Sequence, residues 1–337
     1  MRNIFTITSQ RVSGIRTGKI TLGGKTMTTP AIINATSRGA IPHVTHDLLA
    51  DLAMPPARFL NMGDFLDTSK IIQEHGSVES FLGTQDILFG CLGHIKSGSN
   101  KSVEYKSMLQ SHVGSRQMKI TEYTELCKAV KTDICLPLYD VPPTEDIAKS
   151  RAFKSIQRTE TYLKEMIGNF ENVFGVVSAS SKDLAQSLLE MLAKYPTLTG
   201  LAFNVPISVI SQLNIPDEFK EKPLMYLKPI KGTDLKDLLN LGFDLFIVDV
   251  HKEYTEKGIA VVGNSEEEKS INLNDECHVE DAKPLVNDCK CYACEHHIRA
   301  YINHLLKTRE MLGFVLLQIH NIHHLNQLLV SLINKSS

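Results

Sequence analysis

Three cysteines that could bind a metal ion stand close together near the end of this 337-residue chain: Cys289, Cys291 and Cys294. The chain has seven cysteines, an odd number, and residues 1–10 contain no continuous apolar run like that of a secretory signal. This combination favours a reduced, cytosolic protein in which clustered thiols bind metal rather than form disulfides. The alternatives are a chance cluster of free thiols and a redox Cys-x-x-Cys pair. The adjacent third cysteine favours zinc, which prefers four such ligands in a tetrahedron.

The fourth ligand cannot be chosen from spacing, because histidines are frequent in this part of the chain. His304 follows Cys294 by ten residues, roughly 15 Å along a continuous helix and too far for one tetrahedron. His320 would lie roughly 18 Å away in a straight helical hairpin. His320 can reach the cysteines only if the first helix ends earlier, for example with Thr308 as the N-cap of a new helix. The competing histidines are His278, His296, His297, His304, His320, His323 and His324. Spacing alone therefore leaves His297 and His320 as equal candidates.

The composition is that of a soluble globular protein with a sizeable core, since 42% of residues are hydrophobic and 22% are charged. The formal net charge is −2, so no overall positive field marks a protein that binds nucleic acid by itself. No stretch approaches the roughly 18 apolar residues of a membrane span. Contact with RNA would have to come from a local patch or a partner, and membrane attachment would have to be peripheral.

Short apolar runs alternate with amphipathic stretches in the middle of the chain. This alternation, at steps of roughly 20–40 residues, indicates repeated βα units around a parallel sheet. Periodicity does not decide whether that sheet closes into a barrel. The predicted strands are Ile134–Leu138, Val173–Val177, Leu201–Val205, Leu224–Leu227 and Leu245–Val250, and the predicted helices are Ser150–Ile167, Lys182–Lys194 and Thr233–Leu241.

The amino-acid composition becomes more polar after Gly258, which indicates a division of the chain into three parts. Residues 264–288 are polar and acidic, with Glu266, Glu267 and Glu268 in a row, as in a solvated surface loop. We therefore expect a barrel domain at 1–263, a connecting loop at 264–288, and a zinc module with a C-terminal helix at 289–337.

The C-terminal motifs resemble the zinc module of the tRNA-guanine transglycosylase family. In that family the histidine of an Ile-His-Asn segment is the fourth ligand, so the resemblance implies His320 as the ligand and one zinc ion per chain. It also implies an irregular (β/α)8 TIM-type barrel carrying a C-terminal zinc-binding helical module. The motifs are Cys289-x-Cys291-x-x-Cys294, Arg299-Ala300-Tyr301-Ile302-x-His304-Leu305-Leu306, Glu310-Met311-Leu312-Gly313 and Ile319-His320-Asn321; weaker matches are Arg16-x-Gly18-x-Ile20, Ser150-Arg151-Ala152, Gly200-Leu201-Ala202 and Gly242-Phe243-Asp244-Leu245-Phe246.

The residues that carry catalysis in this family are missing from the matching positions. Catalytic members exchange guanine in tRNA through an Asp nucleophile, while a second Asp handles the proton on the base. The nucleophile would follow Phe246, where this chain has Ile247, and the segment of the second Asp is represented by residues 100–104. Glu253 and Glu256 replace arginines and would repel an RNA backbone. The resemblance therefore implies no catalytic residue.

Asp249 keeps an alternative open. It stands two residues after Ile247, so strand alternation would point both side chains to one face, near the strand end where barrel enzymes place their chemistry. An active transglycosylase using a displaced Asp249 is one alternative, and a zinc-containing barrel scaffold independent of tRNA is another.

The segments Thr255-Glu256-Lys257-Gly258 and Asn100-Lys101-Ser102-Val103 are similar to those of non-catalytic subunits of the family's eukaryotic enzymes. This implies a heterodimer with a catalytic subunit that inserts queuine at the wobble position of tRNAs with GUN anticodons. It further implies contact with tRNA through the complex, a homodimer when alone, and a cytoplasmic protein partly attached to the mitochondrial outer membrane.

Overall fold

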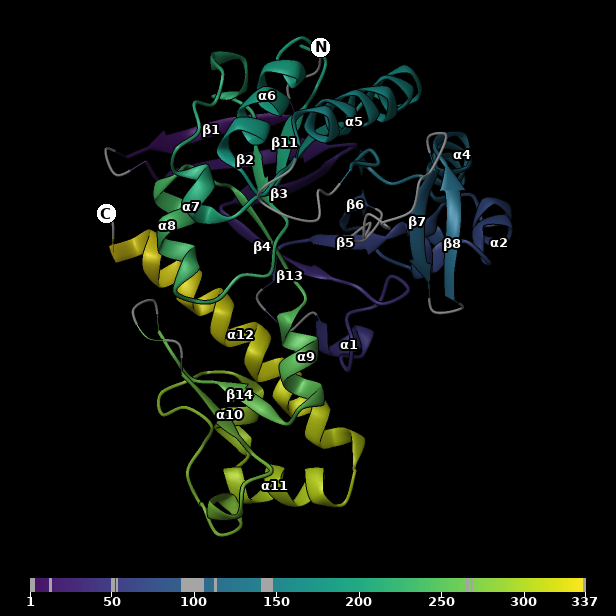
Figure 1. The fold of residues 1–337 in the computed structure, drawn as a ribbon. Helices are drawn as coiled ribbons and strands as arrows, with labels where there is room; N and C mark the ends of the chain where they lie inside the picture. Colours follow the sequence, from purple (N-terminus) through teal and green to yellow (C-terminus); the bar gives the residue numbers. More distant parts are fainter. Residues whose placement is uncertain are drawn as a thin grey trace.

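Eight parallel strands form the centre of the molecule (Figure 1). The computed structural model describes residues 4–11, 14–49, 52, 54–91, 106–111, 114–140, 148–264, 267 and 269–335. The strand order is β10-β11-β12-β13-β4-β5-β6-β9, and a parallel bridge between Cys135 and Val173 joins the two edges. The sheet is thus closed into the (β/α)8-type barrel that the family resemblance implied. The strands are β4 (Ala31–Ala35), β5 (Ala57–Asn61), β6 (Ile87–Cys91), β9 (Ile134–Cys135), β10 (Phe174–Ser178), β11 (Gly200–Asn204), β12 (Leu224–Tyr226) and β13 (Leu245–Val248).

Both faces of the barrel wall are buried, which explains why its strands are continuous apolar runs. In β13, Leu245 and Ile247 belong to the cluster inside the barrel, whereas Phe246 and Val248 pack against the surrounding helices. The outer layer and its loops contain α1 (His46–Leu49), η1 (Met62–Phe65), α2 (Ser69–Glu74), α3 (Val78–Leu82), α4 (Ile120–Val130), α5 (Lys149–Asn169), α6 (Lys182–Leu192), α7 (Ile207–Ile210), η2 (Asp217–Phe219) and α8 (Asp234–Asn240).

An antiparallel sheet covers the N-terminal end of the barrel. It consists of β1 (Phe5–Gln10), β2 (Arg16–Leu22) and β3 (Lys25–Thr29), and its apolar face joins the cluster inside the barrel. A buried ion pair between Arg16 and Asp244, 2.5 Å long, fixes this sheet to the start of β13. A separate hairpin, β7 (Lys106–Ser111) with β8 (Gly114–Lys119), precedes α4.

The C-terminal part forms a second body beside the barrel, at the bottom of Figure 1. The long helix α12 begins in this body and ends against the barrel, where Leu325, Leu329 and Leu332 pack in the outer core. Among the residues that the structure describes, no helix is both long and apolar enough to cross a membrane. The second body contains α9 (Val250–Glu256), β14 (Ile259–Val261), β15 (Ser270–Asn272), η3 (Glu276–His278), α10 (Tyr292–His296), α11 (Arg299–Lys307) and α12 (Met311–Lys335).

Candidate metal centre and barrel mouth

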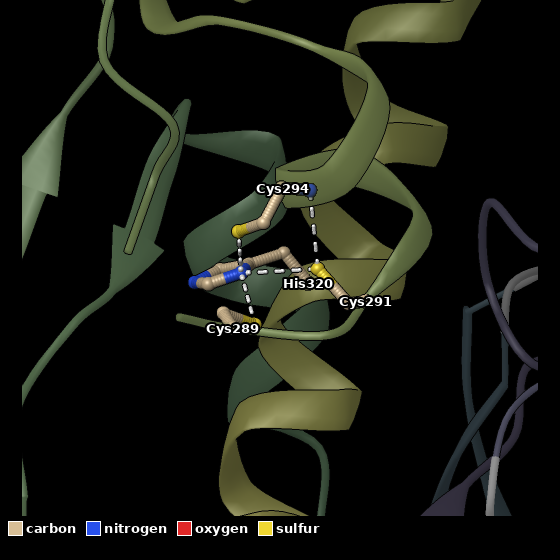
Figure 2. Close-up of side chains that lie close together, drawn as sticks. All are labelled: Cys289, Cys291, Cys294 and His320. Carbon is tan, nitrogen blue, oxygen red and sulfur yellow. Dashed lines mark hydrogen bonds between the residues drawn. The ribbon is translucent and has the colours of Figure 1, made fainter. Parts of the chain in front are cut away.

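Four side chains that could hold a metal ion come together from three parts of the second body (Figure 2). Cys289 and Cys291 lie in the loop before α10, Cys294 lies in α10, and His320 lies in the middle of α12. The chain turns back early enough to bring His320 there, because α11 ends at Lys307 and α12 begins at Met311. The break that the sequence allowed at Thr308 therefore exists, although Thr308 is the C-cap of α11 and not an N-cap.

The spacing of the four ligand atoms fits a tetrahedral zinc ion. The Nδ1 atom of His320 lies 3.8, 3.5 and 3.3 Å from the Sγ atoms of Cys289, Cys291 and Cys294. All four ligand atoms lie within 4.8 Å of one another. A tetrahedron with normal Zn–S and Zn–N bonds has edges of about 3.5–3.8 Å. The group could therefore hold a metal ion such as zinc.

Neighbouring hydrogen bonds orient the ligands. The Nε2 atom of His320 donates to the carbonyl oxygen of Val261 at 2.9 Å, which leaves Nδ1 facing the sulfur atoms. The backbone N–H of Cys294 donates to Sγ of Cys291 at 3.4 Å. Burial lowers the pKa of His320, but the Cys289 and Cys294 sulfurs outweigh it and raise that pKa to about 9. A metal ion would thus have to displace a proton from this imidazole, so binding is coupled to proton release.

Polar residues on both sides of His320 connect the metal centre to the segment that follows β13. Asn321 accepts from the N–H of Val261 at 2.9 Å and donates to the carbonyl of Ile259 at 3.0 Å. The hydroxyl of Thr255, in α9, donates to Gln318 at 2.7 Å, and both side chains are buried. Hydrogen bonds therefore connect the residues on both sides of His320 to α9 and β14.

The other candidate ligand, His297, lies outside the four-residue group. Its ring stacks on Tyr301 at 5.1 Å and contacts the edge of Tyr292 at 5.7 Å. Tyr292 also stacks on His296 at 4.4 Å. We call these four rings, all at least partly exposed, the aromatic patch. Sequence reasoning missed the patch, although the i,i+4 spacing of aromatic and histidine residues in 292–301 was a signal for it.

At position 247, where the family resemblance places the nucleophile of catalytic members, this chain has an isoleucine inside the barrel. Ile247 is 7% exposed, pairs in register with Ile33 of β4 and packs inside the barrel. Strand β13 ends at Val248, and Asp249 is the exposed N-cap residue just before α9. The strand alternation on which the Asp249 alternative rested therefore stops before this residue. The segment 100–104 lies outside the described residues.

Two other acidic residues near this end of the barrel are paired with basic side chains. Asp140, which follows β9, receives a two-point ion pair from Arg151 and lies 3.9 Å from Arg158. Sequence reasoning did not single out Asp140, because its partners lie on the following helix. Glu253 pairs with Lys257 at 2.5 Å in exposed positions on α9.

Comparison with known proteins agrees with this geometry. The family model for queuine tRNA-ribosyltransferase matches residues 11–333. A protein of Schizosaccharomyces pombe is 25% identical over 92% of this chain and 75% of its own length. A human protein is 26% identical over 93% of this chain and 91% of its own length. Both are named queuine tRNA-ribosyltransferase accessory subunit 2. Because the model covers nearly the whole chain, the chain belongs to the queuine tRNA-ribosyltransferase family.

Proposed function

We propose that this chain is the non-catalytic subunit of a heterodimeric queuine tRNA-ribosyltransferase. The observation that carries the proposal is Ile247, an aliphatic side chain packed inside the barrel at the position of the family's nucleophile. An isoleucine offers no atom that could attack an anomeric carbon. Asp249 is exposed beyond the end of the strand, and the charge of Asp140 is neutralised by arginines. Neither carboxylate therefore replaces a nucleophile at position 247. Relatives with the accessory-subunit name support the same role.

The Cys3His group is proposed to hold one structural zinc ion. Four protein ligands leave no open position for substrate, and such closed sites supply folding energy. The ligands are Cys289, Cys291, Cys294 and His320. We propose residues 1–263 as the barrel unit, 264–288 as the connection and 289–337 as the zinc unit with its helix; α9 and β14, at the end of the first range, pack against α12 of the zinc unit.

The aromatic patch is the surface proposed to contact the catalytic subunit. Tyr292 is 52% exposed and Tyr301 38% exposed, and Ile298, 41% exposed, lies between them in the sequence. Tyrosine and other large amphipathic side chains are enriched at protein interfaces, where they bury much area at little entropic cost. In the absence of the partner, a second copy of this chain would cover the same patch and give a homodimer.

The catalytic subunit is proposed to provide most of the contacts to tRNA. The net charge of −2 gives this chain no general attraction for RNA. Its role would be to support exchange of guanine for queuine at the wobble position of tRNAs with GUN anticodons. We further propose a cytoplasmic protein, part of which attaches peripherally to the mitochondrial outer membrane.

The test is reconstitution with the catalytic subunit. We expect the two chains to co-purify, the isolated chain to exchange no labelled guanine in tRNA, and the mixture to be more active than the catalytic subunit alone. Asp249→Asn should leave the activity of the mixture unchanged. Exchange by the isolated chain would favour an active enzyme that uses Asp249. Failure to bind the catalytic subunit would favour a scaffold independent of tRNA.

A further inference from the structure

A cavity opens onto one of the proposed zinc ligands and not onto the others. It has a volume of about 270 Å³ and lies between the loop before α10 and one face of α12. Cys289 lines it, whereas Cys291 and Cys294 do not. Its walls are Val286, Asn287, Asp288, Cys289, Lys290, His323, His324 and Gln327.

The three thiols differ in how a small molecule from solvent could reach them. Cys291 is 2% exposed and accepts a hydrogen bond from the N–H of Cys294. Cys289 and Cys294 are both partly exposed, and Cys289 in addition lines a cavity large enough to hold small solutes. Outside this group, Cys277 is exposed, while Cys91, Cys127 and Cys135 are buried.

We propose that Cys289 is a site of reversible oxidation by small peroxides, and that its oxidation releases the zinc ion. A metal ligand must be a thiolate, which is the form that reacts with peroxides. The cavity gives a small peroxide a space beside Cys289, whereas Cys291 is buried and Cys294 does not line this cavity. The proposal rests on the metal assignment made above and adds a reactive residue to it.

The chemistry balances with hydrogen peroxide as the oxidant. The Cys289 thiolate attacks one peroxide oxygen, the O–O bond breaks, and the leaving hydroxide takes a proton to give water and a sulfenic acid. The Cys294 thiolate then attacks the sulfenic sulfur, forms the S–S bond and expels the second hydroxide, which also becomes water. Two electrons pass from the two sulfurs to the peroxide. With two of its four ligands joined in a disulfide, the site could no longer hold a zinc ion in a closed tetrahedron.

The disulfide would also change the surface next to the site. Tyr292, in the aromatic patch, stands between Cys291 and Cys294 in the sequence, so movement of α10 would move the patch. If the patch binds the catalytic subunit, as proposed above, then peroxide would weaken assembly.

The experiment uses the full chain with Cys277→Ser, which removes the exposed free thiol. Hydrogen peroxide is added, zinc release is followed with a chromogenic chelator, and oxidised cysteines are mapped by mass spectrometry at half release. We expect Cys289 to be oxidised first, a Cys289–Cys294 disulfide to appear with the zinc, and a thiol reductant plus zinc to restore the site. Oxidation that begins at Cys291 or at a buried thiol would overturn the proposal.

A second variant tests the cavity without changing a ligand. Gln327→Trp places an indole at the cavity wall and should slow zinc release roughly tenfold, because reaction at a thiolate depends on access. The matched control is Val330→Trp, an exposed position on the same helix that does not line the cavity. Equal release rates in the two variants would refute the role of the cavity. A folded protein that carries no zinc would instead overturn the metal assignment and, with it, this proposal.

Discussion

His251 provides a test of the interface between α9 and α12. Its imidazole is 3% exposed, and neither ring nitrogen has a hydrogen-bond partner among the described residues. Burial, followed by the nearby His324 and His320, lowers the pKa of His251 to about 3. The folded protein therefore keeps this ring neutral at pH values where the unfolded chain, with a pKa of about 6.5, takes up a proton.

The sign and size of the effect follow from linkage. Because the folded-state pKa lies below the unfolded-state pKa, stability falls as the pH drops below about 6.5. At pH 5 the His251 contribution amounts to a loss of about 2 kcal/mol relative to pH 7.5, at about 1.4 kcal/mol per pH unit. His251→Leu removes the titrating group and two unpaired buried nitrogens, so it should abolish this part of the loss.

The assay is urea unfolding of the zinc-loaded wild type and the His251→Leu variant at pH 7.5 and pH 5.0. Acid also protonates the zinc ligands, but in both proteins, so that contribution cancels in the difference. His75→Gln, at an exposed position, is the control and should behave as the wild type does. Equal losses of stability in wild type and His251→Leu would refute the reasoning.

Three further changes address the metal, the partner surface and the barrel. Cys291→Ser should reduce the zinc content from about one ion per chain to nearly none, measured by elemental analysis, and should make the second body protease-sensitive; full zinc content would contradict the ligand assignment. Tyr301→Glu should weaken binding to the catalytic subunit roughly 10–100-fold in a titration, whereas Phe153→Glu, exposed on α5, should not; equal affinities would place the interface elsewhere. Asp244→Ala should lower the free energy of unfolding by about 3–5 kcal/mol in urea, because it leaves Arg16 buried without its counter-charge; a loss below 1 kcal/mol would show that the pair matters little.

Five of the eight parallel strands, β9 to β13, were predicted, because both faces of each are buried and they are therefore continuous apolar runs; β4, β5 and β6 were not predicted. The predicted strand Leu245–Val250 is β13, but it ends at Val248. The apolar pattern could not show this end, because Val250 at the start of α9 is apolar as well. The short elements β15 and η3, within the acidic stretch 264–288, were also missed. They are held by tertiary contacts such as the hydrogen bond from Asn303 to the carbonyl of Leu273.

The metal centre was predictable in part. Spacing identified the three cysteines, because Cys-x-Cys-x-x-Cys lies within one tight loop. Spacing could not choose His320 over His297, because the choice depends on how the chain turns between α11 and α12. In that turn Arg309 has a left-handed backbone conformation, with φ of 58°. An arginine in the sequence does not predict this conformation. Family resemblance supplied the choice, and the structure brings His320 to the thiols.

The central claim is that this chain lacks the nucleophile that the family resemblance implies for catalytic members, and therefore forms no covalent intermediate with tRNA. The direct measurement is to incubate tRNA with each subunit alone and with the mixture, under conditions that trap the intermediate, and to separate the products on a denaturing gel. We predict covalent tRNA on the catalytic subunit only, and an unchanged pattern with Asp249→Asn. A tRNA-linked band on this chain that disappears with Asp249→Asn would contradict the account.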